Sequence, residues 1–259
     1  MLAVGGLTAL ALYMNQTKKQ EVAEAGTETK NVKIPWAEKL RDGQMRALKV
    51  GQEKDQKVLI SRYQGKLYAT ANFCSHFGVP LDGGMLVDDK VLCPAHLAGF
   101  SVVTGEVDRA PALDGLATFP IVEENGTSFV QVPVDGLPRR KSMPLAKRDP
   151  NNKTHFVIIG GGPAGLNCAE TLRQSGFTGQ ITVLSKEDSV PYDRTLLSKA
   201  LPAGDPSKWA LRPAEYLSEA DIDYKLKTAA FAVNTEVKKV ITTRGKHIYY
   251  DKLLIASGS

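Results

Sequence analysis

The sequence predicts a multi-domain protein in which an all-β domain precedes part of an α/β domain. A chain of 259 residues with 42% hydrophobic content can bury two modest cores. Short apolar segments separated by turn residues begin near residue 33, and this spacing is typical of small antiparallel domains. From residue 154 a buried strand, a glycine-rich turn, a helix and a second strand follow one another, which is the order of a βαβ unit.

The composition indicates which class of partner to exclude and which redox compartment to expect. The net charge of +5 and the pI near 9.0 are mild, and aromatic residues make up only 7%. A nucleic-acid-binding domain needs a basic face with aromatic side chains that stack on bases, so we predict no nucleic acid partner. The 3 cysteines are too few for a disulfide framework and indicate a reducing compartment.

The first 14 residues form an apolar run that is followed by Lys18 and Lys19. A membrane-spanning helix needs about 20 apolar residues. The run also lacks the basic start and the cleavage site of a signal peptide. A weak membrane anchor, a trimmed targeting segment, an imprecise start and a dispensable tip all stay open. Residues 15–31 are polar and predict a disordered lead-in, so residues 1–32 precede the first domain.

The first domain, residues 33–133, is predicted to be a small antiparallel sandwich or barrel. Gln64-Gly65 and Asn125-Gly126 lie between apolar segments and predict two hairpin turns. The loops between such strands are the usual place for a metal or binding site. The expected strands are residues 45–50, 57–62, 66–71, 90–93, 118–122 and 128–132.

Two short boxes in this domain carry metal-ligand chemistry, Cys74-Ser75-His76 and Cys93-Pro94-Ala95-His96. Thiolate and imidazole donors together select zinc or an iron–sulfur cluster. In a Cys2His2 zinc finger the cysteines form one pair and the histidines the other. Here each box contains one of each, which favours a two-iron cluster with two Cys on one iron and two His on the other.

The stretch from Trp36 to Pro133 resembles a Rieske domain. Beside the boxes, this resemblance rests on Gly78-Val79-Pro80-Leu81, Phe100 and Thr104-Gly105-Glu106. It implies a [2Fe–2S] cluster held by Cys74, His76, Cys93 and His96. Unrelated structural Cys and His residues, or a structural zinc ion, are the alternatives. The extra cysteine pair of respiratory Rieske proteins has no counterpart here.

Two positions depart from the Rieske pattern, since an aromatic residue is usual at Ala95 and a glycine at Leu97. A side chain at residue 97 restricts the backbone where glycine would allow a close approach. We therefore expect an altered environment around the cluster. Pro111 is expected either on a loop that covers the cluster or in a plain turn. Residues 134–153 are rich in proline and basic side chains and predict an interdomain linker.

The second domain, residues 154–259, is predicted to be Rossmann-like. A buried strand at 155–159 leads into Gly160-Gly161-Gly162-Pro163-Ala164-Gly165, then a helix to about Ser175 and a strand at 181–184. In this context Gly160 suits the tight turn, Gly162 the approach of a pyrophosphate and Gly165 helix packing. Pro163 and Ala164 open the helix, whose N-terminus faces the phosphates. Glu187, with Asp188 as the alternative, is expected to bind the ribose hydroxyls.

The segment Pro191-Tyr192-Asp193-Arg194-Thr195-Leu196-Leu197-Ser198-Lys199 resembles one in the ferredoxin reductase and apoptosis-inducing factor flavoproteins. The resemblance implies that Arg194 and Lys199 contact FAD. Thr195 replaces the usual proline. The final strand ends in Ala256-Ser257-Gly258, similar to the Ala-Thr-Gly turn of these flavoproteins. The family's NAD domain and the rest of its FAD domain have no counterpart, so we expect an incomplete FAD/NAD(P)-binding domain.

Together the two halves are similar to the Rieske-containing, apoptosis-inducing-factor-like oxidoreductases. This resemblance implies an electron-transfer enzyme in which NAD(P)H reduces FAD and electrons pass to the [2Fe–2S] cluster or to an unknown redox acceptor. A non-catalytic redox-sensing Rieske module and a zinc-stabilised interaction domain are the alternatives. The sequence identifies no catalytic residue. Mitochondrial location follows from the family, with the cytoplasm as the alternative, and membrane association through residues 1–14 stays open.

Overall fold

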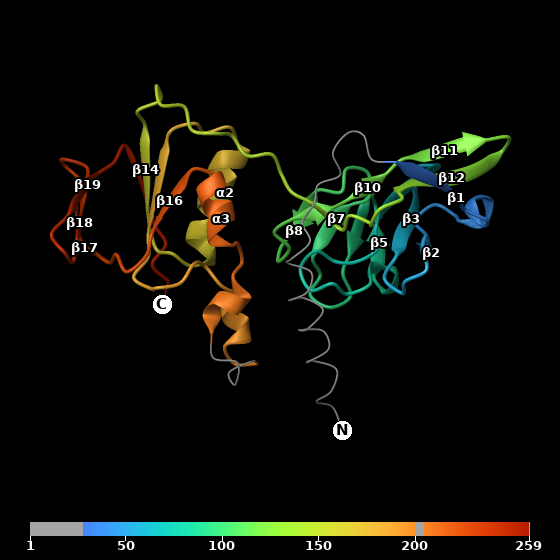
Figure 1. The fold of residues 1–259 in the computed structure, drawn as a ribbon, viewed down its shortest axis with the longest axis horizontal. Helices are drawn as coiled ribbons and strands as arrows, with labels where there is room; N and C mark the ends of the chain where they lie inside the picture. Colours follow the sequence, from blue (N-terminus) through green and yellow to red (C-terminus); the bar gives the residue numbers. More distant parts are fainter. Residues whose placement is uncertain (1–27, 200–204, 259) are drawn as a thin grey trace. The chain divides into compact units, whose positions relative to one another are not determined.

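The computed structural model describes residues 28–199 and 205–258, and their fold is drawn in Figure 1. The chain divides into two compact units, one that ends at Met143 and one that begins at Pro144. The predicted apolar tip, residues 1–14, and most of the predicted lead-in lie outside the described residues.

The first unit is built from short antiparallel strands, as predicted. Its sheets have the strand orders β10-β4-β3-β2, β5-β6-β7-β8, β1-β12-β11 and β13-β9. The 3-10 helices are η1 (Ala37–Lys39) and η2 (Leu81–Gly83). The strands are β1 (Thr29–Lys33), β2 (Met45–Lys49), β3 (Lys57–Tyr63), β4 (Lys66–Ala71), β5 (Met85–Val87), β6 (Lys90–Leu92), β7 (Gly99–Ser101), β8 (Val107–Arg109), β9 (Gly115–Leu116), β10 (Thr118–Phe119), β11 (Ile121–Glu124), β12 (Thr127–Pro133) and β13 (Arg140–Lys141).

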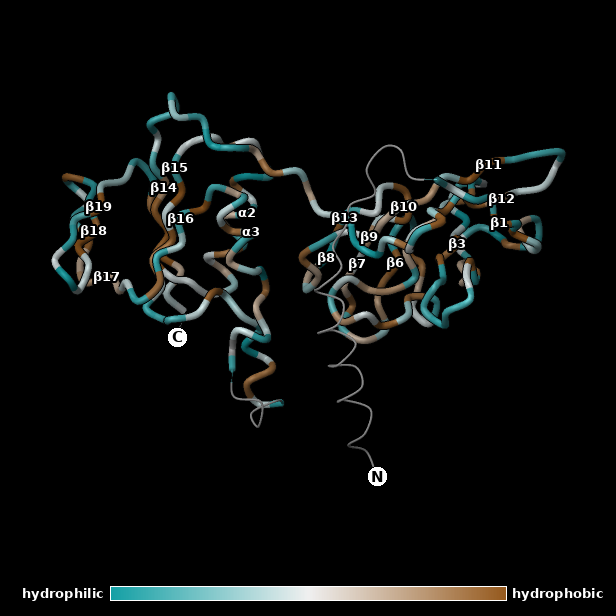
Figure 2. Tube along the Cα trace, viewed as in Figure 1, coloured by the Kyte–Doolittle hydropathy of each residue, from teal (hydrophilic) through white to brown (hydrophobic). Residues whose placement is uncertain are grey.

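Both predicted hairpin turns are confirmed. Gln64 and Gly65 have φ of 50° and 76° and join β3 to β4, and Asn125 and Gly126 have φ of 50° and 73° and join β11 to β12. Two successive residues with positive φ match the twist of antiparallel strands. The β11–β12 turn is hydrophilic (Figure 2).

The core of the first unit forms around β3. Val58, Leu59 and Ile60 are consecutive residues, and each is 0% exposed. Successive side chains of a strand point to opposite faces, so both faces of β3 are covered. Phe100 on β7 and Leu116 on β9 belong to the same buried cluster. The loops that carry the Cys and His boxes therefore extend from a rigid interior.

Two segments that were predicted to be irregular form strands instead. Residues 29–31 of the predicted lead-in belong to β1, which pairs with β12 over five residues. Residues 140–141 of the predicted linker form β13, which pairs with β9. Neither has the apolar alternation of a half-buried strand, because β1 is mostly exposed and β13 is only two residues long. Their pairing depends on neighbours that are distant in sequence.

The second unit contains the predicted βαβ arrangement. Parallel strands lie in the order β16-β15-β14-β20. Helix α2 ends at Gln174, close to the predicted end, and Gly176 takes a φ of 83° just beyond it. The elements are β14 (His155–Ile159), α2 (Pro163–Gln174), β15 (Gln180–Leu184), η3 (Arg194–Leu196), η5 (Pro206–Trp209), α3 (Ala214–Glu219), β16 (Ile222–Lys225), β17 (Ala230–Asn234), β18 (Lys239–Thr242), β19 (His247–Tyr249) and β20 (Lys252–Ile255).

The parallel sheet of the second unit is covered on both faces. Helices α2 and α3 lie on one side and the antiparallel sheet β17-β18-β19 on the other (Figure 1). Ile158 packs with the helices and Val157 with β18 and β19, in keeping with the alternation of a strand. The strands of this sheet accordingly include hydrophobic stretches (Figure 2). All four strands end at one edge, where the glycine-rich turn also lies.

Candidate metal centre and nucleotide site

The two Cys and His boxes fold into loops of the same geometry. In the first, the Cys74 N–H donates to Val79 O at 2.9 Å, and the Gly78 N–H donates to Cys74 O at 2.8 Å. In the second, the Cys93 N–H donates to Ala98 O at 2.9 Å, and the Leu97 N–H donates to Cys93 O at 3.0 Å. Each loop thus turns back on its own cysteine. The two boxes form a repeated unit that presents one thiol and one imidazole.

The two thiols lie together and away from solvent. Cys74 is 2% exposed and Cys93 is 1% exposed. Their mutual hydrogen bond, together with burial, raises the pKa of Cys74, and the same bond lowers the pKa of Cys93 to about 6. Backbone N–H groups of His76 and Phe77 also face the Cys74 sulfur, and those of Ala95 and His96 face the Cys93 sulfur. N–H donors around sulfur favour the thiolate that a metal requires.

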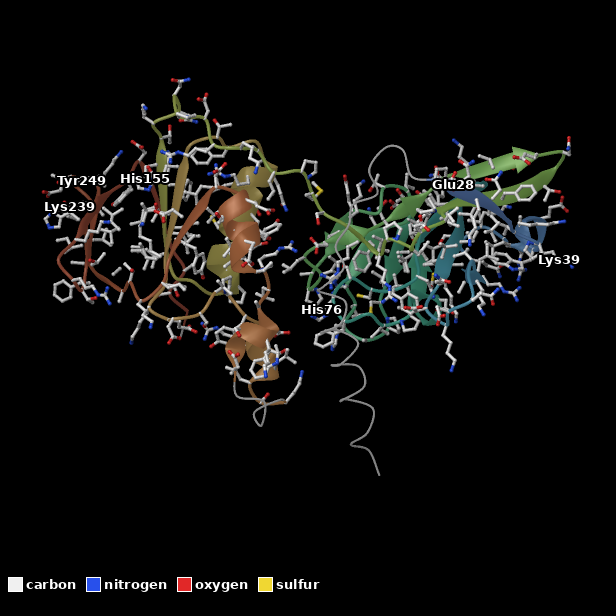
Figure 3. All side chains as sticks on the ribbon, viewed as in Figure 1. Glu28, Lys39, His76, His155, Lys239 and Tyr249 are labelled. Carbon is white, nitrogen blue, oxygen red and sulfur yellow. The ribbon has the colours of Figure 1, made fainter. Side chains whose placement is uncertain are left out.

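The two imidazoles form a second pair. The ring centroids of His76 and His96 are 5.1 Å apart, and Phe77 packs against both, at 4.5 Å from His76 and 5.6 Å from His96. His76 is half-buried and His96 is exposed. His76 lies at the end of the first unit away from the β11–β12 turn (Figure 3). An imidazole pair at the surface and a thiol pair inside match the donor set of a two-iron cluster with mixed ligands.

The four donors of the two boxes are one pair of thiols and one pair of imidazoles. Among residues 28–199 and 205–258, no three His, Cys, Asp or Glu side chains are close enough together to hold one ion. A structural zinc site needs four donors around one point. A structural zinc ion therefore stays the alternative to a two-iron cluster.

The two departures from the Rieske pattern have different structural consequences. Leu97 has a φ of 57°, which is the counterpart of the φ of 66° at Gly78 in the other loop. Leu97 therefore adopts the left-handed conformation that a glycine adopts without steric cost. Ala95 is exposed, so the missing aromatic side chain leaves this part of the surface open.

The segment around Pro111 is attached to the first box. The Ser75 hydroxyl donates to Asp114 O at 2.5 Å, and Ser75 stands between Cys74 and His76 in sequence. Pro111 itself is exposed and follows a cis peptide bond after Ala110. The loop is therefore held against the box through Asp114.

The glycine-rich turn of the second unit is shaped by close backbone contacts. A Cβ atom on Gly160 would lie 2.0 Å from Ala256 O, and one on Gly165 would lie 2.0 Å from Gly160 O. Neither site tolerates a side chain, which agrees with the predicted roles in the turn and in helix packing. The turn brings the end of β20 and the start of α2 together. Ala256 belongs to the predicted terminal turn.

The start of α2 has the features of a phosphate site. Gly162 is the N-cap residue and contributes no side chain, and no acidic residue occupies the first turn. A Cβ atom on Gly162 would meet only the Arg194 guanidinium, at 3.8 Å. Pro163 and Ala164 are exposed. Helix N–H groups, a nearby cation and open space above Gly162 together fit a dinucleotide pyrophosphate.

The predicted cofactor residues beyond the turn lie partly together. Glu187 and Arg194 form an ion pair, and the Arg194 guanidinium lies 5.2 Å from the Tyr192 ring centroid. Asp188, the alternative acidic residue, faces Lys227 at 3.9 Å instead. Lys199 is exposed at the end of a described segment. The structure thus brings Arg194 and Glu187 to the glycine-rich turn, and the place of Lys199 in the site stays a prediction.

Sequence reasoning missed two side chains at the same edge. The Tyr224 hydroxyl at the end of β16 donates to Gly161 O. Ser185, which follows β15, lies where a Cβ atom on Gly161 would be, at 2.4 Å. Burial raises the pKa of Tyr224, so its hydroxyl stays a donor at neutral pH. Tyr224 lies in the last two residues of β16 and Ser185 directly follows β15, and the rule that ligands bind at the carboxyl ends of parallel strands was the signal that could have identified them.

Comparison with known proteins identifies a known family for each of the two domains. The Rieske [2Fe-2S] domain family matches residues 30–120, and the pyridine nucleotide-disulphide oxidoreductase family matches residues 154–259. Apoptosis-inducing factor 3 of Homo sapiens is 36% identical over 226 residues, which cover 85% of this chain and 37% of that protein. The chain belongs to the Rieske-containing, apoptosis-inducing-factor-like oxidoreductases. It consists of a Rieske domain and a pyridine nucleotide-disulphide oxidoreductase domain.

Other relatives are similar to a smaller part of the chain. Rhodocoxin reductase of Rhodococcus erythropolis is 38% identical over 106 residues, which cover 40% of this chain and 25% of that protein. Rubredoxin-NAD(+) reductase of Pseudomonas putida is 36% identical over 106 residues, which cover 40% of this chain and 28% of that protein. The chain spans little more than a third of apoptosis-inducing factor 3. Within the described part of the chain, no helix is both long and apolar enough to cross a membrane.

Proposed function

We propose that this chain is an electron-transfer module that binds a Rieske [2Fe–2S] cluster in its first domain and FAD in its second. The observation that carries the proposal is the pair of matching loops that place two buried thiols together and two imidazole rings 5.1 Å apart. Cys74 and Cys93 are the proposed ligands of one iron and His76 and His96 those of the other. When bound, the cluster would accept or donate one electron at a time, and FAD would accept a hydride from NAD(P)H.

The residues of the first domain would control how the cluster is held. Buried thiols would exclude water from the sulfur side, and the backbone N–H groups of both boxes would stabilise negative charge on the sulfurs. His96 is exposed and offers a route to a redox partner at the surface. The identity of that partner and any location in mitochondria stay predictions from the family.

The second domain would bind the pyrophosphate of FAD at the start of α2. Arg194 would exchange part of its pairing with Glu187 for the phosphates, and Glu187 would accept hydrogen bonds from the ribose hydroxyls. Tyr224 would keep the glycine-rich turn in place. Oxidation of NAD(P)H by the longer proteins of this family is part of the proposal, since the chain spans only a fraction of their length.

Electron paramagnetic resonance tests the cluster proposal. The chain is produced with iron and sulfide available and is then reduced with dithionite. We expect the signal of a two-iron cluster with mixed Cys and His ligands, and a midpoint potential between about −150 and +300 mV. Cys93→Ser should lose the signal, whereas Cys168→Ser, which changes the remaining cysteine of the chain, should keep it. A protein that contains zinc without iron and sulfide would refute the proposal and favour a structural zinc site.

Titration with FAD tests the second site. We expect Arg194→Gln to weaken FAD binding by about 10- to 100-fold, because a charge-assisted hydrogen bond contributes about 1.5–3 kcal/mol. Arg244→Gln removes the same charge from the turn between β18 and β19 and should leave the affinity unchanged. Equal affinities for the two variants would place the FAD elsewhere.

A further inference from the structure

Strand β13 lies in a segment that neither family match covers. The Rieske match ends at residue 120 and the oxidoreductase match begins at residue 154. In sequence this segment resembles a solvated basic tether. In the structure its Arg139, Arg140 and Lys141 all contact the first domain, through side chains or backbone.

Arg140 is linked to the first ligand box in two steps. Its guanidinium Nη1 lies 3.6 Å from Asp114 Oδ2, and the two side chains are 20% and 3% exposed. The backbone oxygen of Asp114 accepts the hydrogen bond of the Ser75 hydroxyl at 2.5 Å. Ser75 lies between the proposed ligands Cys74 and His76. A buried carboxylate is costly without an opposite charge, so Arg140 helps to keep Asp114 where Ser75 meets it.

Arg139, which precedes β13, contacts the residue before the same box. Its guanidinium carbon lies 4.8 Å from the ring centroid of Phe73, the residue before Cys74, and it also pairs with Asp55. The Ala117 N–H donates to Arg139 O at 3.3 Å, and the Ala71 N–H donates to Ala117 O at 2.8 Å. A cation over an aromatic face is attracted to it, and the backbone bonds fix the distance. Arg139 and Arg140 therefore contact Phe73, which precedes the box, and Asp114, which is bonded to Ser75 inside it.

We propose that Arg139 and Arg140 are positioning residues of the Rieske site, and that β13 holds the first ligand box and the loop of Asp114 together around the cluster. This inference rests on the proposed function of the first domain. The two guanidinium groups also offset the negative charges of Asp55 and Asp114 near the box, and this compensation favours the reduced and more negative cluster.

A role in folding alone would have a different signature. It would lower the amount of cluster or the stability of the domain but leave the properties of the intact cluster unchanged. A positioning role alters the geometry and the electrostatics of the bound cluster. The decisive readouts are therefore the g values and the midpoint potential of the cluster that is present.

The experiment compares Arg140→Gln with Arg140→Lys and with a matched control. Arg46→Gln removes the same charge from the same domain, where the Arg46 guanidinium lies 5.1 Å from the ring centroid of Trp36. We expect Arg140→Gln to shift the g values and to move the midpoint potential to a more negative value, by more than Arg46→Gln does. Arg140→Lys keeps the charge and should return the potential toward that of the unmodified chain.

The outcomes separate this inference from the proposed function. Absence of the mixed-ligand signal in the unmodified chain would refute the cluster itself. A normal signal there, with unchanged g values and potential in Arg140→Gln, would overturn the positioning role alone. If Arg140→Gln does not fold, Ser75→Ala takes its place, because it removes one hydroxyl group from the same link. Shifted g values in Ser75→Ala support the inference, and unchanged ones overturn it.

Discussion

Leu97 provides a direct test of how the second ligand loop is built. Its φ of 57° and the hydrogen bond from its N–H to Cys93 O at 3.0 Å reproduce the geometry of Gly78 in the first loop. A side chain in this conformation costs about 1–2 kcal/mol. The Leu97 residue is also 43% exposed, so a substitution here leaves no large cavity.

The comparison of Leu97→Gly with Leu97→Ala isolates this backbone cost. Both remove the leucine side chain, but only glycine removes the steric penalty of about 1–2 kcal/mol. Against this, glycine lowers the free energy of unfolding by about 0.4–1 kcal/mol relative to alanine, because it gives the unfolded chain more conformational entropy. The Leu97→Gly variant should therefore be the more stable of the two by about 0.5–1 kcal/mol. Ala95→Gly is the matched control, since Ala95 is not among the positive-φ residues. This substitution should lower the free energy of unfolding by about 0.5–1 kcal/mol.

The free energy of unfolding of the first domain can be followed separately. The chain has only 2 tryptophans, Trp36 in the first unit and Trp209 in the second. In a Trp209→Phe background, Trp36 fluorescence during urea denaturation of the metal-free, reduced protein reports the first unit. A difference of about 0.5–1 kcal/mol shifts the midpoint by roughly 0.3–0.7 M urea. A Leu97→Gly variant that is less stable than Leu97→Ala would refute the argument that residue 97 carries a conformational cost.

Three further predictions concern the second domain, and each uses Trp209 fluorescence in a Trp36→Phe background unless another readout is named. Burial lowers the pKa of His155, so the unfolded chain binds more protons at mildly acid pH. Stability should fall as the pH drops from about 7 toward 5, through the ordinary histidine pKa of about 6.5, and His155→Gln should flatten this dependence. Arg173 is 0% exposed and donates to the backbone oxygens of Phe177, Gly179, Ala220 and Asp221. Arg173→Met should lower the free energy of unfolding by at least about 3 kcal/mol, and a loss below about 1 kcal/mol would contradict this accounting of buried acceptors. Gly160→Ala should prevent native folding of the domain, because its Cβ would lie 2.0 Å from Ala256 O. Gly162→Ala should leave the stability nearly unchanged but weaken FAD binding in the titration, and equal behaviour of the two variants would refute the separate roles of these glycines.

Much of the architecture was predictable because local signals and tertiary structure agree. The hairpins at Gln64-Gly65 and Asn125-Gly126 and the helix that ends before Gly176 follow from residues that tolerate positive φ. The parallel strand, glycine turn and helix at 155–174 follow from a spacing that only a few folds satisfy. In the boxes, the types and order of the donors indicated a mixed-ligand cluster before any geometry was known.

The sequence by itself therefore determined the fold class, the order of the domains and the residue types of both candidate sites, since each depends on short-range spacing and side-chain chemistry. Tertiary structure decided that β1 pairs with β12 and that β13 pairs with β9. It also decided that Tyr224 reaches Gly161. These contacts join residues that are distant in the chain. They are backbone hydrogen bonds between strands and one hydrogen bond from a hydroxyl group. Such contacts produce no periodic apolar pattern in the sequence.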